Sequence, residues 1–130
     1  DILTLKDTEA TRDNIIAAFE DFLIGTSQAG DVAVFHFSGH GRRIGDPNPT
    51  RVAGGERDPL VSTLVPYQSP EAATEIPDIM GSSLFLLTHR LRTENVTVVL
   101  DSCYAEGGIR GSVRKRAVAL WWQTTFTPSE

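Results

Sequence analysis

Cysteine is scarce in this chain, since Cys103 is the one cysteine among 130 residues. A lone cysteine cannot close an internal disulfide, so Cys103 is left as a packed thiol, a metal ligand or a nucleophile. No apolar run approaches the roughly 18 to 20 residues that cross a bilayer, and no signal-peptide pattern opens the sequence. These features exclude a disulfide scaffold and predict a cytoplasmic protein with no membrane partner.

Positive charge is also limited. Twelve Lys and Arg residues stand against 17 Asp and Glu residues, which gives a formal net charge of −5. The broad positive field that makes nucleic acid a default partner is therefore missing, and we expect no nucleic-acid partner. The basic cluster Arg114–Arg116 is too short to reverse that expectation. We interpret this cluster as a solvated loop.

The remaining composition is that of an ordinary globular protein. Hydrophobic residues make up 40% of the chain and charged residues 22%. A chain of this length suits one small domain that buries roughly two-thirds of its unfolded surface. The first residue is Asp1 rather than Met, so we expect either processing or, in view of the organisation below, a piece of something longer.

Two stretches carry the spacing of amphipathic helices. Small polar residues that can cap a helix, Asp7, Thr8 and Thr11, precede apolar residues at three- and four-residue intervals between positions 15 and 23. This pattern predicts a helix that ends near Gly25. Leucines 84, 87 and 91 repeat behind Ser82 or Ser83 in the same way, which predicts a second helix capped by one of the two serines.

Two short apolar runs predict buried strands of a parallel sheet. The runs cover 32–37 and 96–100, and each is rich in β-branched residues and stops at polar or small residues. His36 lies within the first run, and we interpret it as a core histidine. Between the runs, residues 41–77 change to Gly, Pro, Arg, Asp and Thr, which predicts a long surface excursion with a short strand or hairpin arm at 60–65.

Alternating strands and helices predict an α/β fold with right-handed crossovers and helices on both faces of a mostly parallel sheet. Ligands of such sheets gather at the carboxyl ends of the strands. The polar residues that follow the two predicted strands are Ser38-Gly39-His40-Gly41 and Asp101-Ser102-Cys103-Tyr104. If the strands are parallel neighbours, His40 and Cys103 lie at the same edge.

A cysteine beside a histidine suits nucleophilic catalysis. The thiolate is the reactive form, and a thiol with a pKa of about 8.5 is only slightly ionised at neutral pH. A nearby imidazole stabilises or generates the thiolate and can then protonate a leaving amine. Gly39 and Gly41 would let a peptide backbone approach closely and leave main-chain amides free to face an oxyanion.

The two blocks resemble the catalytic blocks of caspase-like cysteine peptidases, and are closest to fungal metacaspases. The blocks are Phe35-His36-Phe37-Ser38-Gly39-His40-Gly41 and Val98-Val99-Leu100-Asp101-Ser102-Cys103. Weaker similarities are the predicted helix from Thr11 to Leu23, Leu64-Val65-Pro66-Tyr67 and Ile76-Pro77-Asp78. The resemblance covers about residues 1–108 of a single caspase-like domain, with 109–130 as a linker or tail.

The resemblance implies a role for each matched residue. Cys103 would be the nucleophile and His40 the general acid/base, and the amides of Gly41 and Cys103 would form the oxyanion hole. Asp101 would lie in an acidic pocket that selects Arg or Lys at the cleaved position, where a carboxylate can bind a guanidinium bidentately. Glu56 and Asp58 are candidates for a second acid in that pocket, although Glu56-Arg57-Asp58-Pro59 departs from the acidic run common there.

The same resemblance implies a three-layer fold that is incomplete at both ends. Family members usually carry a first strand and helix before the segment that matches Ile2–Leu5, and a smaller segment after the cysteine. A second chain or a missing segment would then complete the sheet. Tyr104 stands where many metacaspases have His. Calcium dependence is common in the family; the sequence holds no dense oxygen-ligand loop and requires no cofactor, so calcium stays open.

Other interpretations remain open. Cys103 could be a buried structural thiol, His40 a loop histidine and Asp101 a turn carboxylate. The chain could then be a catalytically inactive caspase-like interaction or regulatory module, or an unrelated flavodoxin-like domain in which Cys103 and His40 lie far apart. A zinc site built on His36, His40 and Cys103 has no fourth ligand at metal-site spacing, and we expect no metal ligands.

Overall fold

A computed structural model describes residues 1–45, 60–68 and 77–102 of the chain. The helical elements are η1 (Asp7–Glu9), α1 (Arg12–Ala18), the π-helical η2 (Phe19–Ile24) and α2 (Gly81–His89). The strands are β1 (Val32–Ser38), β2 (His40–Gly45), β3 (Leu60–Val65), β4 (Ile79–Met80) and β5 (Asn95–Asp101). No helix within these ranges is long and apolar enough to span a membrane.

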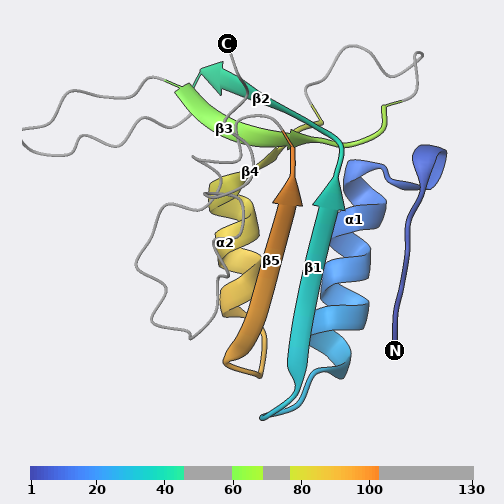
Figure 1. The fold of residues 1–130 in the computed structure, drawn as a ribbon, viewed down its shortest axis with the longest axis vertical. Coiled ribbons are helices and arrows are strands. Elements are labelled where there is room, and N and C mark those ends of the chain that lie inside the picture. The colour runs from blue at the N-terminus through green and yellow to red at the C-terminus, as the bar shows by residue number, and fades with distance from the viewer. Residues whose placement is uncertain (46–59, 69–76, 103–130) are drawn as a thin grey trace, which may run out of the picture.

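The two predicted parallel strands are confirmed as β1 and β5. They pair in parallel from Val32↔Asn95 to Ser38↔Asp101, so both strands end at the same edge of the sheet (Figure 1). Alternate residues point to opposite faces of a strand. One face of this sheet therefore carries only apolar side chains, which are Ala33, Phe35, Phe37, Val96, Val98 and Leu100.

Both predicted helices are present, and both pack into one core with that face. Ile15 and Phe19 from the first helical segment join Leu84 and Leu87 from α2 in the buried cluster. The Phe19 ring also lies against Phe35 of β1, with ring centroids 5.4 Å apart. This arrangement is a mixed α/β fold in which the core lies between the parallel sheet and its two helices.

The two helices begin differently from each other. As predicted, Thr11 caps α1, because its side chain accepts a hydrogen bond from the Asn14 N–H at 3.3 Å. The prediction of a serine cap for α2 is wrong, since the helix begins at Gly81 and its N-cap is Met80, without a side-chain cap. Strand β4 leads directly into α2, so the entry of this helix is fixed by strand pairing with β3 rather than by a hydroxyl.

On the opposite face of the parallel sheet the residues of β1 are exposed, whereas Thr97 and Val99 of β5 are half-buried. Val32 is 72% exposed and Val34 51% exposed, and His36, on the same face, is exposed as well. The interpretation of His36 as a core histidine is therefore wrong. An apolar run alone does not say which face of a strand is covered, and the described residues leave this one uncovered.

The antiparallel sheet has the order β2-β3-β4. The arm predicted at 60–65 is confirmed as β3, but β2, which occupies the first residues of the predicted excursion, was not predicted. β2 pairs with β3 from His40↔Val65 to Gly45↔Leu60. The sequence Gly41-Arg42-Arg43-Ile44-Gly45 has no apolar alternation, so the pattern that marks most half-buried strands is missing.

Gly39 is the single residue between β1 and β2, and it joins the two sheets. A Cβ at this position would stand 3.1 Å from Cζ of Phe37, which is closer than ordinary side-chain packing allows. A larger residue would force the Phe37 ring to shift by a few tenths of an ångström, so glycine favours the direct turn from the parallel sheet into the antiparallel one. This turn places the next residue, His40, at the start of β2.

Candidate functional site

The two sequence blocks meet where β1 and β5 end. Ser38 and Asp101 are partners in the parallel register. The Gly39 N–H donates to the Asp101 carbonyl at 3.1 Å, and the Ser38 hydroxyl donates to Oδ2 of Asp101 at 3.2 Å. Hydrogen bonds therefore link Ser38 and Gly39, which precede His40, to Asp101, which lies two positions before Cys103 in the sequence.

His40 is the first residue of β2 and is exposed. Its backbone lies opposite Val65, and Gly41 lies opposite Leu64. Because β2 starts one residue after β1 ends, His40 is held beside the carboxyl edge of the parallel sheet (Figure 1). The described structure therefore brings His40, Gly41 and Asp101 to one end of the fold.

Asp101 is exposed at the end of β5. Its carboxylate accepts the Ser38 hydroxyl described above, which restricts the directions that the carboxylate can take. An exposed carboxylate at a strand end can receive a cationic group from solvent. The other predicted site residues, Cys103, Glu56 and Asp58, lie outside the described residues.

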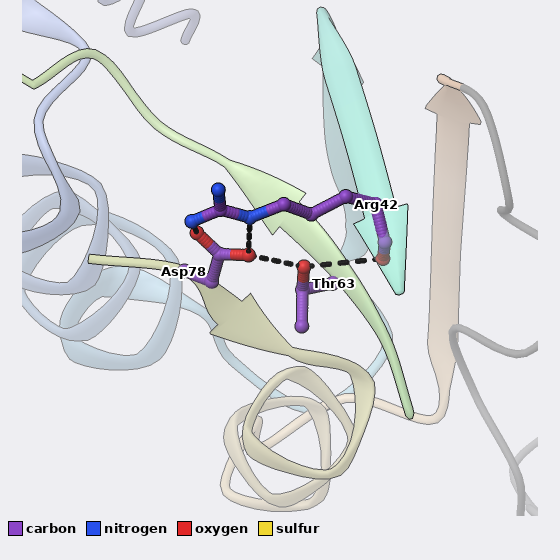
Figure 2. Close-up of polar contacts among 3 residues, drawn as sticks. All are labelled: Arg42, Thr63 and Asp78. Carbon is purple, nitrogen blue, oxygen red and sulfur yellow. Dashed lines mark hydrogen bonds and ion pairs between the residues drawn. The ribbon is translucent and has the colours of Figure 1, made fainter. Parts of the chain in front are cut away.

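A polar network that the sequence did not predict includes Arg42, which lies two residues after His40 on β2 (Figure 2). Nε of Arg42 donates to Oδ2 of Asp78 at 2.6 Å, and Nη2 donates to Oδ1 at 2.5 Å, which makes a bidentate pair. The Thr63 hydroxyl lies 2.5 Å from Oδ2 of Asp78 and 3.2 Å from the Arg42 carbonyl. Three separate stretches of sequence are joined in this way.

Asp78 is the buried partner of this network. The Asp78 side chain is 1% exposed, whereas the Arg42 side chain is 46% exposed. Burial alone would raise the pKa of Asp78, but hydrogen bonds from Arg42 and Thr63, together with the Arg42 charge, hold that pKa below its ordinary value. The same hydrogen bonding raises the pKa of Arg42 against its partial desolvation. Both groups are therefore charged at neutral pH.

One signal in the sequence could have indicated this network. Asp78 stands directly before Ile79, so a carboxylate enters an apolar stretch where only a paired charge is tolerated. Its partner could not be identified in advance, because Arg42 is 36 residues away and reaches Asp78 only through the pairing of β2 with β3 and of β3 with β4.

The described residues do not fit a calcium site. Within residues 1–45, 60–68 and 77–102, no three His, Cys, Asp or Glu side chains form a group that could hold a metal ion. The one buried carboxylate of these ranges, Asp78, already has its charge balanced by Arg42. We therefore derive no catalytic step through calcium.

Comparison with protein families adds evidence that is independent of this geometry. A family model described as the metacaspase, peptidase C14 domain matches residues 3–109, which include both sequence blocks. No curated protein and no solved structure matches the chain. Because the family model covers most of the 130 residues, the chain belongs to the metacaspase family of peptidase C14 domains.

Proposed function

We propose that this chain is a cysteine endopeptidase that cleaves peptide bonds after Arg or Lys, with Cys103 as nucleophile and His40 as general acid/base. Membership of the peptidase C14 family supports the peptidase activity. The observation that carries the assignment of the site is the junction at Ser38 and Asp101, where the block that contains His40 meets the strand that leads to Cys103.

The chemistry follows from the two side chains. The Cys103 thiolate attacks the carbonyl carbon of the scissile bond, and the resulting oxyanion accepts hydrogen bonds from the amides of Gly41 and Cys103. Protonated His40 gives its proton to the leaving amine as the C–N bond breaks and an acyl-enzyme forms. Neutral His40 then takes a proton from the water that attacks the thioester, and departure of the Cys103 thiolate releases the carboxylate product and restores the thiolate–imidazolium pair.

Asp101 supplies the proposed preference for a basic residue. Its carboxylate is exposed at the edge where the substrate would lie, and it is oriented by Ser38. A planar carboxylate matches a guanidinium better than an ammonium, so Arg should be cleaved faster than Lys. Glu56 and Asp58 remain our candidates for a second acid in this pocket.

The proposal also includes a cover for the exposed face of β1 in the parallel sheet. We propose a three-layer arrangement in which a second chain or a further segment covers the exposed face of β1 and completes the sheet. The support is the exposure of Val32 and Val34, because parallel sheets are normally covered on both faces. Peptides with Arg or Lys at the cleaved position are the proposed substrates, and nucleic acid is not a proposed partner.

The same exposed face favours the alternative of a catalytically inactive interaction module. Val32 and Val34 would then bind a partner protein while the site at the strand ends performs no chemistry. This alternative predicts binding without turnover.

Hydrolysis of fluorogenic peptides ending in Arg, Lys or Asp, with and without calcium, tests the proposal. We expect cleavage after Arg and Lys that disappears in Cys103→Ala and falls by a factor of about a hundred in Asp101→Asn, because a charge-assisted contact is lost. Asp13→Asn is the matched control, since Asp13 is an exposed carboxylate on α1. Cleavage after Asp would contradict the role of Asp101, and unchanged cleavage in Cys103→Ala would contradict the role of the thiol.

A further inference from the structure

Arg42 and His40 lie on the same face of β2. They are two residues apart on one strand, so their side chains point to the same side of the antiparallel sheet. Thr63 lies opposite Arg42, and Met80 of β4 lies opposite Thr63. The Arg42 guanidinium therefore extends across the face of β3 toward Asp78, which directly precedes β4 (Figure 2).

The position of β2 in its sheet makes the contact of Arg42 important. It is an edge strand with β3 as its one neighbour in the described sheet, and none of its residues is fully buried. Arg42 connects this strand to a carboxylate that is almost completely buried beyond β3. The Thr63 hydroxyl donates its one proton to Oδ2 of Asp78 and lies 3.2 Å from the Arg42 carbonyl, so it lies between the two partners of the ion pair.

His40 is thus flanked by two anchors. On one side, the Gly39 N–H is bound to the Asp101 carbonyl of β5. On the other side, Arg42 is bound to Asp78. The first anchor fixes the end of the parallel sheet, and the second fixes the start of the antiparallel one. The residues between the anchors are His40 and Gly41, which the proposed mechanism uses as acid/base and oxyanion donor.

We propose that Arg42 is a positioning residue whose bidentate contact with Asp78, supported by Thr63, holds His40 and Gly41 in the geometry that peptide cleavage requires. The proposal rests on the function proposed above for the catalytic step, but the placement of His40 can be measured without turnover. Arg42 acts through the backbone of β2 and does not touch the reacting atoms.

Conservative substitutions separate positioning from simple stabilisation. Thr63→Val keeps the shape of the side chain and removes its hydroxyl, whereas Thr63→Ser keeps the hydroxyl. Arg42→Lys keeps the charge and removes the bidentate contact. Thr93→Val is the matched control, because the Thr93 hydroxyl is also buried and donates to the Asp31 carbonyl at 2.5 Å, near the opposite ends of β1 and β5.

The first readout is kinetic. In Thr63→Val and Arg42→Lys we expect kcat to fall about tenfold to a hundredfold with KM within about twofold, since small displacements of a catalytic group have effects of this size. Thr63→Ser should restore kcat, and Thr93→Val should keep it, with circular dichroism showing that each variant is folded. Equal kcat in Thr63→Val and Thr93→Val would overturn the proposal.

The second readout is the NMR spectrum of the histidine side chains of the full chain. The sequence has three histidines, and His40 is identified by the loss of its signals in His40→Gln. We expect Thr63→Val and Arg42→Lys to shift the His40 signals and leave those of His36 and His89 in place. Unchanged His40 signals in both variants would overturn the proposal. Shifted signals in a chain without turnover would support positioning while contradicting the peptidase assignment.

Discussion

Both sheets of this chain contribute to one apolar core, since Leu64 of β3 and Ile79 of β4 belong to it, but the antiparallel sheet also holds a buried ion pair. The parallel pair of β1 and β5 rests on an apolar face, where Val98 is 1% exposed and Leu100 5% exposed. The antiparallel sheet carries a buried polar network, in which Asp78 is 1% exposed at its side chain and is paired with Arg42. The hydrophobic effect has no preferred direction, whereas a buried ion pair requires a particular geometry. The polar network therefore lies where the proposed site needs a fixed position.

The largest expected effect comes from placing a charge on the covered face of the parallel sheet. Val98→Asp buries an unpaired carboxylate in the core, which should cost more than about 4 kcal/mol and leave the chain unfolded. Val34→Asp, on the exposed face, should cost about 1 kcal/mol or less. Urea denaturation followed by circular dichroism measures both variants. Equal destabilisation would mean that the two faces are equally buried.

The antiparallel sheet should depend on Asp78 in a different way. Arg42→Ala leaves the buried carboxylate without a partner and should cost about 3 kcal/mol at neutral pH, at the lower end of the range for buried pairs because Arg42 is half exposed. The same denaturation experiment measures this loss. The double variant Arg42→Ala/Asp78→Ala should be more stable than Arg42→Ala alone, because the unpaired charge is removed. A still less stable double variant would contradict this account.

The network also predicts a pH dependence. The folded state holds the pKa of Asp78 below its ordinary value, so its stabilising effect is fully present above about pH 4 and is lost as the pH falls through the folded pKa. The free energies of unfolding of the wild type and of Asp78→Asn should therefore differ most at neutral pH and become similar at acidic pH. Denaturation curves at pH 7, 5, 4 and 3 check this prediction. A difference that grows toward low pH would have the wrong sign.

The smallest effect is expected at an exposed ion pair. Nη1 of Arg90 lies 2.5 Å from Oε1 of Glu20, and both side chains are about half exposed, so neither charge is buried as that of Asp78 is. Arg90→Ala should cost less than about 1 kcal/mol, and raising the salt concentration should remove most of that cost. Parallel melts of Arg90→Ala and Arg42→Ala at low and high salt provide the comparison. If Arg90→Ala lowered the free energy of unfolding as much as Arg42→Ala does, burial of Asp78 would add nothing to the cost of losing its partner.

These two sheets also differ in how well the sequence predicted them. The two apolar runs predicted β1, β5 and their parallel pairing. The spaced leucines predicted α2. The strand β2 was missed because Arg42 and Arg43 interrupt any alternation, and its pairing is determined by a partner about 20 residues away. The exposure of His36 was missed for a related reason, since a strand pattern does not identify the face that is covered.

The site was predicted only as far as local sequence allows. Strand ends could be located from composition, and the structure places His40, Gly41 and Asp101 at one edge of the sheet, whereas the expectation that Cys103 lies there too stays a prediction. The contact between Ser38 and Asp101 depends on register, and the pair of Arg42 and Asp78 depends on two further strand pairings. Such contacts join distant segments, and no local pattern encodes them. The roles of His40 and Cys103 stay predictions.

Activation of Cys103 by His40 can be measured through the pH dependence of cysteine alkylation. Cys103 is the one cysteine of the chain, so the rate of reaction with iodoacetamide reports a single thiol. In the wild type, the midpoint of the rate profile should lie below the value of about 8.5 for a free thiol, and in His40→Ala it should rise toward that value. Identical profiles in the two proteins would contradict this activation.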